Sequence, residues 1–576
     1  MRTRISAILF LLSFMYCSFA NSQNTITATH PLSPDQVRTL IQDSRQKIRS
    51  ILDREVYLPG LAVALVSRDE ILWTEGFGYR DKARTAAVDT NTIFGVLSVS
   101  KSLTVTALMI AVQEGLLDLD VPIKRYLPDL TVQTRFGGDP FAAITIRHLI
   151  SMTSGLTHDA PVGNNSDASS PSYDAHIRSF ARSWMRFRTG ERTEYSGLGT
   201  ELAALCLERV IHRPFTDYVR EKLFAPLGMT RSTYDINAIM RDTNKATGNN
   251  KNIPNLPVEI PMLAPAGVYA NVTDIARFVQ CHLAAGQVRA RSILRKDLIA
   301  TMGTIPFPIE GQVSGYGQGL WVRQYDLGGD VVRSLEHGGG GFGFLSQMKW
   351  LPDLGYGVVV LTNASDQEYG HERIAEDILV RIIEQLTGRK PADPTDWLAR
   401  HTPSLSVAPT YVPEGLEGRY NGTNDDLIFM IRNGRFGFVS GNAFEPMTPV
   451  SRDEFTSKRY LYRFVRRKDG VPVSVVRPYD GTVWCFSEGE GMPRGPEKKE
   501  WASYAGSYVR KRFGVAEKFY NVSVRNGWLH FEGSGQDCRL EEHLPGLFFT
   551  PDGEAVDLRG DAPTYRNIRL YKANTP

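Results

Sequence analysis

The feature that most constrains the fold is a lysine at the start of a long apolar segment. Ser98 and Lys101 precede a run from Leu103 to Val112 that contains no charged residue. Side chains three residues apart share one face of a helix, and the first turn presents free N–H groups that favour an anion. A charged amine that faces an apolar wall is costly unless it is paired. The spacing predicts a nucleophilic serine and its activating lysine at the mouth of a buried helix; the alternative is an N-capping serine with a solvated lysine.

Length and charge limit the classes of protein to consider. The chain has 576 residues, of which 42% are hydrophobic, enough for two or three domains with their own cores. Its 66 basic and 63 acidic residues give a net charge of +3, so the balance does not indicate nucleic acid as a partner. Basic and aromatic residues alternate in 458–468, which is typical of a strand with one core face and one solvated face.

The N-terminal residues predict export. Two arginines precede an apolar stretch, and Ser18-Phe19-Ala20 places small residues where a signal peptidase reads them. Residues 1–20 are therefore predicted to be a signal peptide and the mature protein to be secreted or periplasmic. Bulky residues before Cys17 disfavour a lipoprotein, and no later run reaches the roughly 20 apolar residues of a membrane helix, so no stable anchor is expected. Four scattered cysteines remain, among which a Cys485–Cys538 bridge is conceivable.

Hydrophobic periodicity predicts an α/β sheet with a helical insert. Residues 34–53 have apolar positions at helical intervals, and residues 61–79 are typical of a β-hairpin. Helical patterns dominate from about 146 to 227. Strand patterns return at 319–323, 344–350 and 357–362, and a helix follows at 372–386. Strands at both ends with helices between them imply one sheet that is built from the two ends.

Beyond residue 412 the pattern becomes all-β. Gly418-Arg-Tyr420 followed by Ile431–Phe438 recurs as Gly506-Ser-Tyr508 followed by Val524–Phe531. Each copy contains Asn-Gly between apolar runs, which is a strong hairpin signal. The recurrence predicts two related β units in residues 412–576, and the proline-rich residues 393–411 predict a linker before them.

Six segments within roughly residues 40–390 point to one family. They are Ser98–Lys101, Ile144–Leu156, Pro226–Met229, Pro265–Gly267, Tyr316–Gly319 and His337–Phe342. Their identities and order resemble the serine β-lactamase-related hydrolases: class C β-lactamases, D-alanyl-D-alanine peptidases, D-aminopeptidases and related esterases. The resemblance implies, for residues 21–392, the α/β fold of β-lactamases and penicillin-binding proteins, an antiparallel sheet flanked by helices with a helical insert lobe. The C-terminal region is similar to the lipocalin-like β appendages of such hydrolases.

The resemblance also implies a catalytic group. Tyr195 lies in the segment that matches the second family motif, so it would share protons with Lys101 and take the proton from Ser98. The ordinary pKa values of lysine, about 10.4, and tyrosine, about 10, are too high for a base near neutrality. A desolvated cleft that holds both groups could shift one of them. The sequence leaves open which of the two is the base.

The third motif supplies the expected substrate-binding residues. His337, Gly338 and Gly339 stand where β-lactamases carry Lys-Thr-Gly, and glycines there let a substrate backbone approach the strand. The N–H groups of Gly340 and Ser98 would form an oxyanion hole. The glycine pattern in this stretch runs into a predicted strand, and no metal motif occurs, so no cofactor or metal is expected.

Two departures from the family bear on the substrate. Gly197 stands where members that act on β-lactams usually have an asparagine, and His337, mostly neutral at pH 7, replaces a fixed cation. We therefore predict an exported serine hydrolase that forms an acyl-enzyme on Ser98 with a small ester or a D-amino-acid-containing peptide or amide. The alternatives are a class C-like β-lactamase and a non-catalytic scaffold of the same fold that binds peptidoglycan or a protein.

Overall fold

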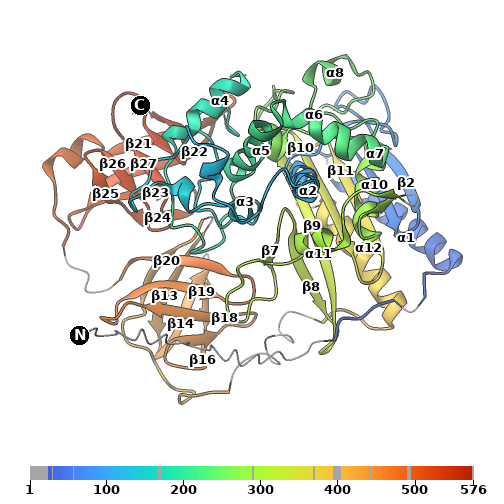
Figure 1. Cartoon of the computed structure of the whole chain (residues 1–576). Helices are drawn as coiled ribbons and strands as arrows, with labels where there is room; N and C mark the ends of the chain where they lie inside the picture. Colours follow the sequence, from blue (N-terminus) through green and yellow to red (C-terminus); the bar gives the residue numbers. More distant parts are fainter. Residues whose placement is uncertain are drawn as a thin grey trace, which may run out of the picture.

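The computed structural model describes residues 24–573 except for gaps at 29, 56, 167–170, 289–290, 367–369, 393–397, 399–403, 424, 441–442 and 490–493. The predicted signal peptide lies outside the described residues, as does much of the predicted linker. The described part contains three large sheets, one of seven strands and two of nine. Figure 1 shows the seven-stranded sheet on the right and the two nine-stranded sheets, in orange and red, on the left.

The seven-stranded sheet has the order β2-β1-β11-β10-β9-β8-β7, and its neighbouring strands are antiparallel. It therefore joins strands from both ends of the first 390 residues, as predicted. Its strands are β1 (Gly60–Ser67), β2 (Ile71–Gly78), β7 (Gly315–Tyr316), β8 (Trp321–Asp326), β9 (Val331–Gly341), β10 (Phe344–Leu351) and β11 (Tyr356–Thr362).

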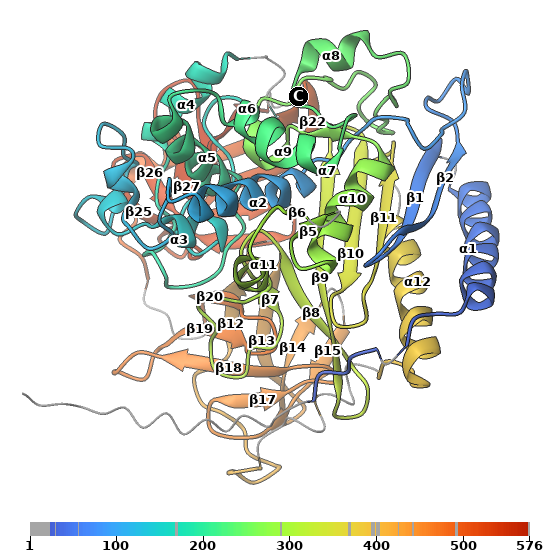
Figure 2. The same cartoon turned by 45° about the vertical axis from the view of Figure 1, so that its right-hand side comes forward.

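Helices cover both faces of this sheet. Figure 2 shows α1 (Pro34–Arg54) and α12 (Gly370–Thr387) on one face and α10 (Val272–Leu283) on the other. The start of α1 follows its sequence, because the Ser33 side chain accepts from the N–H of Gln36 in a capping box. Apolar side chains pack on both faces of β1, so its residues Leu61–Val66 are buried throughout.

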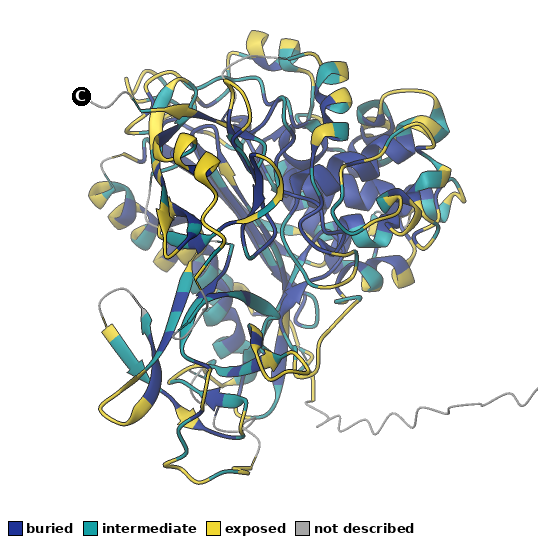
Figure 3. Cartoon of the chain, turned by 90° about the vertical axis from the view of Figure 1, so that its left-hand side faces the viewer, coloured by how far each residue is buried: buried dark blue, intermediate teal, exposed yellow. Residues whose placement is uncertain are grey.

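A largely helical region lies between the two sets of strands. In α2 every residue from Val99 to Ala111 is buried, and Figure 3 shows in dark blue the buried helices and strands of the interior. The helices of the region are α2 (Val99–Gln113), α3 (Ile146–Ile150), α4 (Tyr173–Ser179), α5 (Gly197–Ile211), α6 (Phe215–Val219), α7 (Ala225–Leu227), α8 (Ile236–Arg241), α9 (Leu263–Ala266) and α11 (Lys296–Met302). Its two short strand pairs are β3 (Phe94–Gly95) with β4 (Tyr269–Ala270), and β5 (Gln287–Val288) with β6 (Arg291–Ser292).

The C-terminal region consists of two barrel-like sheets, here called the first and second β units. The first comprises β12 (Gly418–Asn421), β13 (Asp426–Arg432), β14 (Arg435–Ser440), β15 (Ala443–Pro446), β16 (Thr448–Pro449), β17 (Glu454–Thr456), β18 (Leu461–Arg466), β19 (Pro472–Arg477) and β20 (Thr482–Glu488). The second comprises β21 (Gly506–Arg512), β22 (Val515–Arg525), β23 (Trp528–Gly533), β24 (Gln536–Arg539), β25 (Glu541–Leu544), β26 (Leu547–Phe549), β27 (Ala555–Asp557), β28 (Thr564–Tyr565) and β29 (Ile568–Lys572). The fold class predicted from the sequence is confirmed for both regions.

The two β units share their topology. The sheets run β15-β14-β13-β12-β20-β19-β18-β17-β16 and β24-β23-β22-β21-β29-β28-β27-β26-β25, so corresponding strands occupy the same places. Asn433-Gly434 and Asn526-Gly527 form the expected tight hairpin turns, with positive φ at both positions. Each unit encloses its own aromatic core. The four described cysteines are free, and Cys538 is buried in the core of the second unit.

Candidate active site

Ser98 stands at a strained turn between β3 and α2. Leu97 has a φ of +48°, which is uncommon for a residue with a side chain, and such strain often occurs at functional sites. Ser98 is the N-cap residue of α2, but its side chain makes no capping hydrogen bond. The hydroxyl instead lies on the wall of a large cleft. The turn therefore presents Ser98 at the positive end of the buried helix.

Lys101 lies one turn further along α2 and contacts Ser98 directly. Its Nζ is 3.2 Å from the Ser98 Oγ and 3.2 Å from the carbonyl oxygen of Pro265, and the residue is 2% exposed. Burial lowers the pKa of Lys101 to about 7, although Glu201 and Asp159 act to raise it. Burial also raises the pKa of Glu201 to about 8, so this carboxyl is largely neutral at pH 7. Near neutrality a large share of Lys101 is a free amine.

Tyr195 meets the same two groups from the segment before α5. The Lys101 Nζ is 4.7 Å from the centroid of the Tyr195 ring, and the ring stacks on His158 at 5.5 Å. Burial raises the pKa of Tyr195 well above its ordinary value, and a hydrogen bond with Ser98 offsets only part of this effect. The phenol therefore stays protonated at neutral pH. The structure thus brings Ser98, Lys101 and Tyr195 together.

His337 is neutral and has partners at both ring nitrogens. Its Nδ1 lies 2.6 Å from the carbonyl oxygen of Gly338, so Nδ1 carries the proton, and its Nε2 accepts from the Tyr316 hydroxyl at 3.0 Å. Burial, and then the nearby Lys101, lower the pKa of His337 to about 3. His337 therefore supplies no cation to the cleft. Tyr316 belongs to one of the family motifs in the sequence but was not predicted at the site.

Strand β9 passes very close to the turn that holds Ser98. A Cβ added at Gly339 would lie 2.3 Å from the carbonyl oxygen of Val96 and 2.9 Å from the Ser98 nitrogen. Gly338 and Gly340 line the cleft beside Gly339. Gly197 is buried at the start of α5, where an added Cβ would lie 3.0 Å from the carbonyl oxygen of His158, which leaves little room for an asparagine.

The close approach of β9 at Gly339 should make this position sensitive to any side chain. Gly339→Ala should lower kcat/KM by about 100-fold or more, the loss typical of one displaced oxyanion donor, because β9 has to move away from backbone atoms of the Ser98 turn. Gly340→Ala should lose far less, since its added Cβ meets only the Leu345 side chain, at 2.9 Å. Steady-state kinetics on an aryl ester, with melting temperatures for both variants, checks the difference. Equal losses would contradict this account of the contact.

The cleft has a volume of about 1590 Å³ and is lined by all three sheets. The first β unit contributes Arg477 and Asp480, and the second contributes Arg510, Arg512 and residues near its β27 and β28 strands. None of these residues was predicted at the site. They reach it only through docking of the β units, which no local pattern in the sequence reveals.

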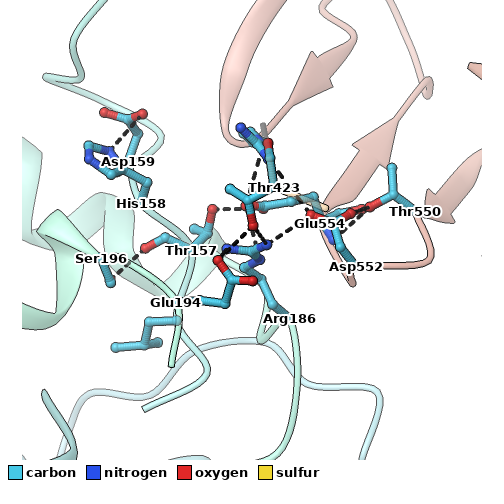
Figure 4. Close-up of polar contacts among 12 residues, drawn as sticks. Thr157, His158, Asp159, Arg186, Glu194, Ser196, Thr423, Thr550, Asp552 and Glu554 are labelled. Atoms are coloured by element: carbon cyan, nitrogen blue, oxygen red, sulfur yellow. Dashed lines mark hydrogen bonds and ion pairs between the residues drawn. The ribbon is translucent and has the colours of Figure 1, made fainter. Parts of the chain in front are cut away.

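A buried ionic network joins the Tyr195 segment to the second β unit. Arg186, 1% exposed, lies 2.8 Å from Asp552, 3.0 Å from Glu554 and 3.4 Å from Glu194, the residue before Tyr195. Figure 4 shows these side chains around the guanidinium, with Thr423 of the first β unit donating to Glu194 at 2.6 Å. The network thus fixes both β units beside the segment that carries Tyr195.

A second chain of hydrogen bonds runs from the second β unit to the start of α5. The Thr157 hydroxyl donates to Glu554 at 2.8 Å, and the Thr157 carbonyl accepts from the Ser196 hydroxyl at 2.7 Å.

Within the described residues no group of three or more His, Cys, Asp or Glu side chains could hold a metal ion. No helix in the described part of the chain has the length and apolar character to cross a bilayer.

The protein has an antiparallel sheet with a helical insert, and a serine and a lysine are paired at the start of α2. These features define the class of serine hydrolases built like penicillin-binding proteins. The chain belongs to the β-lactamase family, whose sequence model, described as Beta-lactamase, matches residues 46–381.

The individual relatives that the chain resembles in sequence are distant. Protein flp of Staphylococcus aureus (strain COL) is 22% identical over 344 residues, which are 57% of this chain and 65% of that protein. The chain thus spans less than two thirds of the length of this relative. The human mitochondrial serine β-lactamase-like protein LACTB is 36% identical over 118 residues, 20% of this chain and 21% of that protein.

The solved structure of SurE with D-Leu has the same fold. It superposes with a TM-score of 0.56 at 18% identity and covers 79% of this chain and 100% of its own. That share of the chain is larger than residues 46–381, so the structural likeness extends beyond the residues of the family match.

Proposed function

We propose that the protein is an exported serine hydrolase that cleaves an ester, or a D-amino-acid-containing peptide or amide, through an acyl-enzyme on Ser98. The observation that supports this most strongly is the 3.2 Å contact between the Ser98 hydroxyl and a buried amine whose pKa is lowered to about 7 by burial. The proposal assigns catalysis to residues 21–392 and a supporting role at the cleft to residues 412–576.

In the first step the neutral Lys101 amine takes the Ser98 proton while Oγ bonds to the substrate carbonyl carbon. The N–H groups of Ser98 and Gly340 then hold the oxyanion. As the carbonyl reforms, the bond to the leaving group breaks, and the leaving group receives the proton from Lys101 through the Tyr195 phenol. Water then attacks the acyl-enzyme, Lys101 again takes a proton, and Ser98 is released with its proton restored.

The surroundings of Lys101 and Tyr195 favour Lys101 as the base. The amine is partly neutral near pH 7, whereas ionising the phenol in its buried site is strongly unfavourable. Tyr195 then acts as a hydrogen-bond donor and proton carrier. The neutral His337 and the missing side chain at Gly197 weigh against efficient β-lactam hydrolysis, and SurE, which has the same fold, was solved with D-Leu.

Covalent labelling tests the nucleophile. A fluorophosphonate should add one adduct to the wild-type protein, on the peptide that contains Ser98, because the hydroxyl is activated by Lys101. The Ser98→Ala variant should remain unlabelled, as seen by mass spectrometry of both digests. An unlabelled wild-type protein would overturn the proposal and favour a non-catalytic scaffold.

A substrate panel separates the enzymatic alternatives. Aryl esters, D-amino-acid anilides and a chromogenic cephalosporin should be compared, each with wild type and Ser98→Ala. We expect the cephalosporin to be the slowest of the three. Cephalosporin turnover faster than ester turnover would identify a β-lactamase instead.

A further inference from the structure

The β21–β22 hairpin of the second β unit reaches into the cleft that contains Ser98. Its turn residues, Phe513 and Gly514, both have positive φ. The Phe513 N–H donates to the carbonyl oxygen of Ser166 at 3.2 Å, and the Phe513 ring lies 5.1 Å from that of Phe342, in the turn between β9 and β10. The hairpin tip is therefore held on two sides by the sheet and insert that carry the catalytic residues.

This hairpin places two arginines on the cleft wall. Arg510 and Arg512 line the same cleft as Ser98 and Gly340, and they are 16% and 23% exposed. An Nη2 of Arg512 lies 3.5 Å from the position of a Cβ added at Gly341, the last residue of β9. The Arg512 guanidinium thus lies directly beyond the proposed oxyanion donor, along the strand on which a substrate would lie.

The positive charge of this group is only partly neutralised. Glu517 binds Arg510 through Nε at 3.2 Å and Nη2 at 2.5 Å, but it approaches Arg512 only to 3.6 Å. The Arg512 Nε is buried and has no hydrogen-bond partner within the described residues. Lys518 pairs directly across from Arg510 in the sheet and adds a third cation.

The acidic residue that faces this group from the insert is already paired. Asp159 lines the same cleft, but its carboxylate lies 3.1 Å from the His158 Nδ1 and accepts from the Asn165 side chain at 3.0 Å. The three cations therefore have Glu517 and Asp159 as acidic neighbours, and Asp159 already has other partners. An anionic group entering the cleft would find donors that remain unused.

We propose that Arg512, supported by Arg510, forms a carboxylate-binding subsite of the Ser98 cleft, so that the preferred substrates carry a free carboxylate near the scissile bond. This inference rests on the proposed function. An arginine fork matches a carboxylate with two parallel hydrogen bonds and stays charged at every accessible pH. Because His337 is neutral, the part of β9 that lines the cleft, from His337 to Gly340, carries no cation. The second β unit thus supplies the charge that this end of the strand lacks.

Matched esters test the subsite in the active enzyme. The monoester of glutaric acid with p-nitrophenol should be hydrolysed with a kcat/KM at least about 10-fold above that of p-nitrophenyl valerate, as expected for one charge-assisted pair. A second pair, 3-carboxyphenyl acetate and phenyl acetate, places the carboxylate on the leaving group. We expect the preference in at least one pair, and Arg512→Met should reduce it to about one. Arg569→Met removes an exposed cation of the same unit that does not line the cleft and should keep the wild-type preference.

A binding measurement separates this inference from the proposed function. In the Ser98→Ala protein, calorimetry should show that glutaric acid monoanilide binds at least about 10-fold more tightly than valeranilide, and Arg512→Met in that background should remove the difference. This result does not depend on turnover. Absence of a preference in both ester pairs and in binding, or a preference that survives Arg512→Met, would overturn the subsite, whereas an unlabelled Ser98 would overturn only the catalytic proposal.

Discussion

Lys101→Met is expected to lower kcat/KM by roughly 10³- to 10⁴-fold, the share of catalysis that a positioned base supplies, while the folded protein stays as stable as wild type or becomes more stable. Methionine fills a similar volume but cannot accept the Ser98 proton. Lys101 is 2% exposed, and burying an amine in an apolar site is unfavourable. Hydrolysis of an aryl ester and the melting temperature measure the two effects separately.

Lys101→Arg distinguishes a base from a mere positive charge. Arginine keeps the charge but does not release its proton near neutrality, so this variant should be as inactive as Lys101→Met and less stable. An arginine variant with more than a tenth of wild-type activity would contradict the role of Lys101 as base.

Wild-type kcat/KM should rise tenfold per pH unit below about pH 7 and level off above it, because the neutral amine is the active form and its pKa is about 7.

Arg186→Met should destabilise the protein by about 3–5 kcal/mol, the usual cost of leaving buried charges without their partner. Asp552 and Glu554 are 3% and 1% exposed, and both contact Arg186. Arg566 approaches them only to 3.7 and 3.4 Å. The variant should also lose activity, because Glu194 next to Tyr195 loses the same partner. Urea unfolding and ester kinetics measure the two losses.

Two further variants serve as controls for Arg186. Arg213→Met removes an exposed ion pair with Glu221 and should leave the urea unfolding midpoint close to that of wild type. Glu554→Gln added to Arg186→Met should recover part of the loss, because it removes one of the unpaired charges. If the double variant were as unstable as the sum of its single variants, the network would not be coupled through Arg186.

Local sequence patterns predicted those elements whose cause is local. Helix α1, the hairpin of β1 and β2 and the two Asn-Gly turns all appear where the pattern places them. Strand β9 was harder to predict, because the four glycines at its end have no side chains to form an alternating pattern. Its position was expected only from the resemblance of the His337 segment to a family motif.

The sequence by itself determined the class of fold and the pairing of Ser98 with Lys101, because residues three apart on a helix share one face wherever that helix packs. It also placed Tyr195 in a family motif, but it could not say which group is the base. Only the tertiary structure favours Lys101 for that role, because the pKa of Lys101 depends on burial by segments distant in the chain, such as Pro265. The cleft wall formed by Arg510 and Arg512 was likewise decided by the docking of the second β unit, which depends on surfaces that meet only after each part has folded.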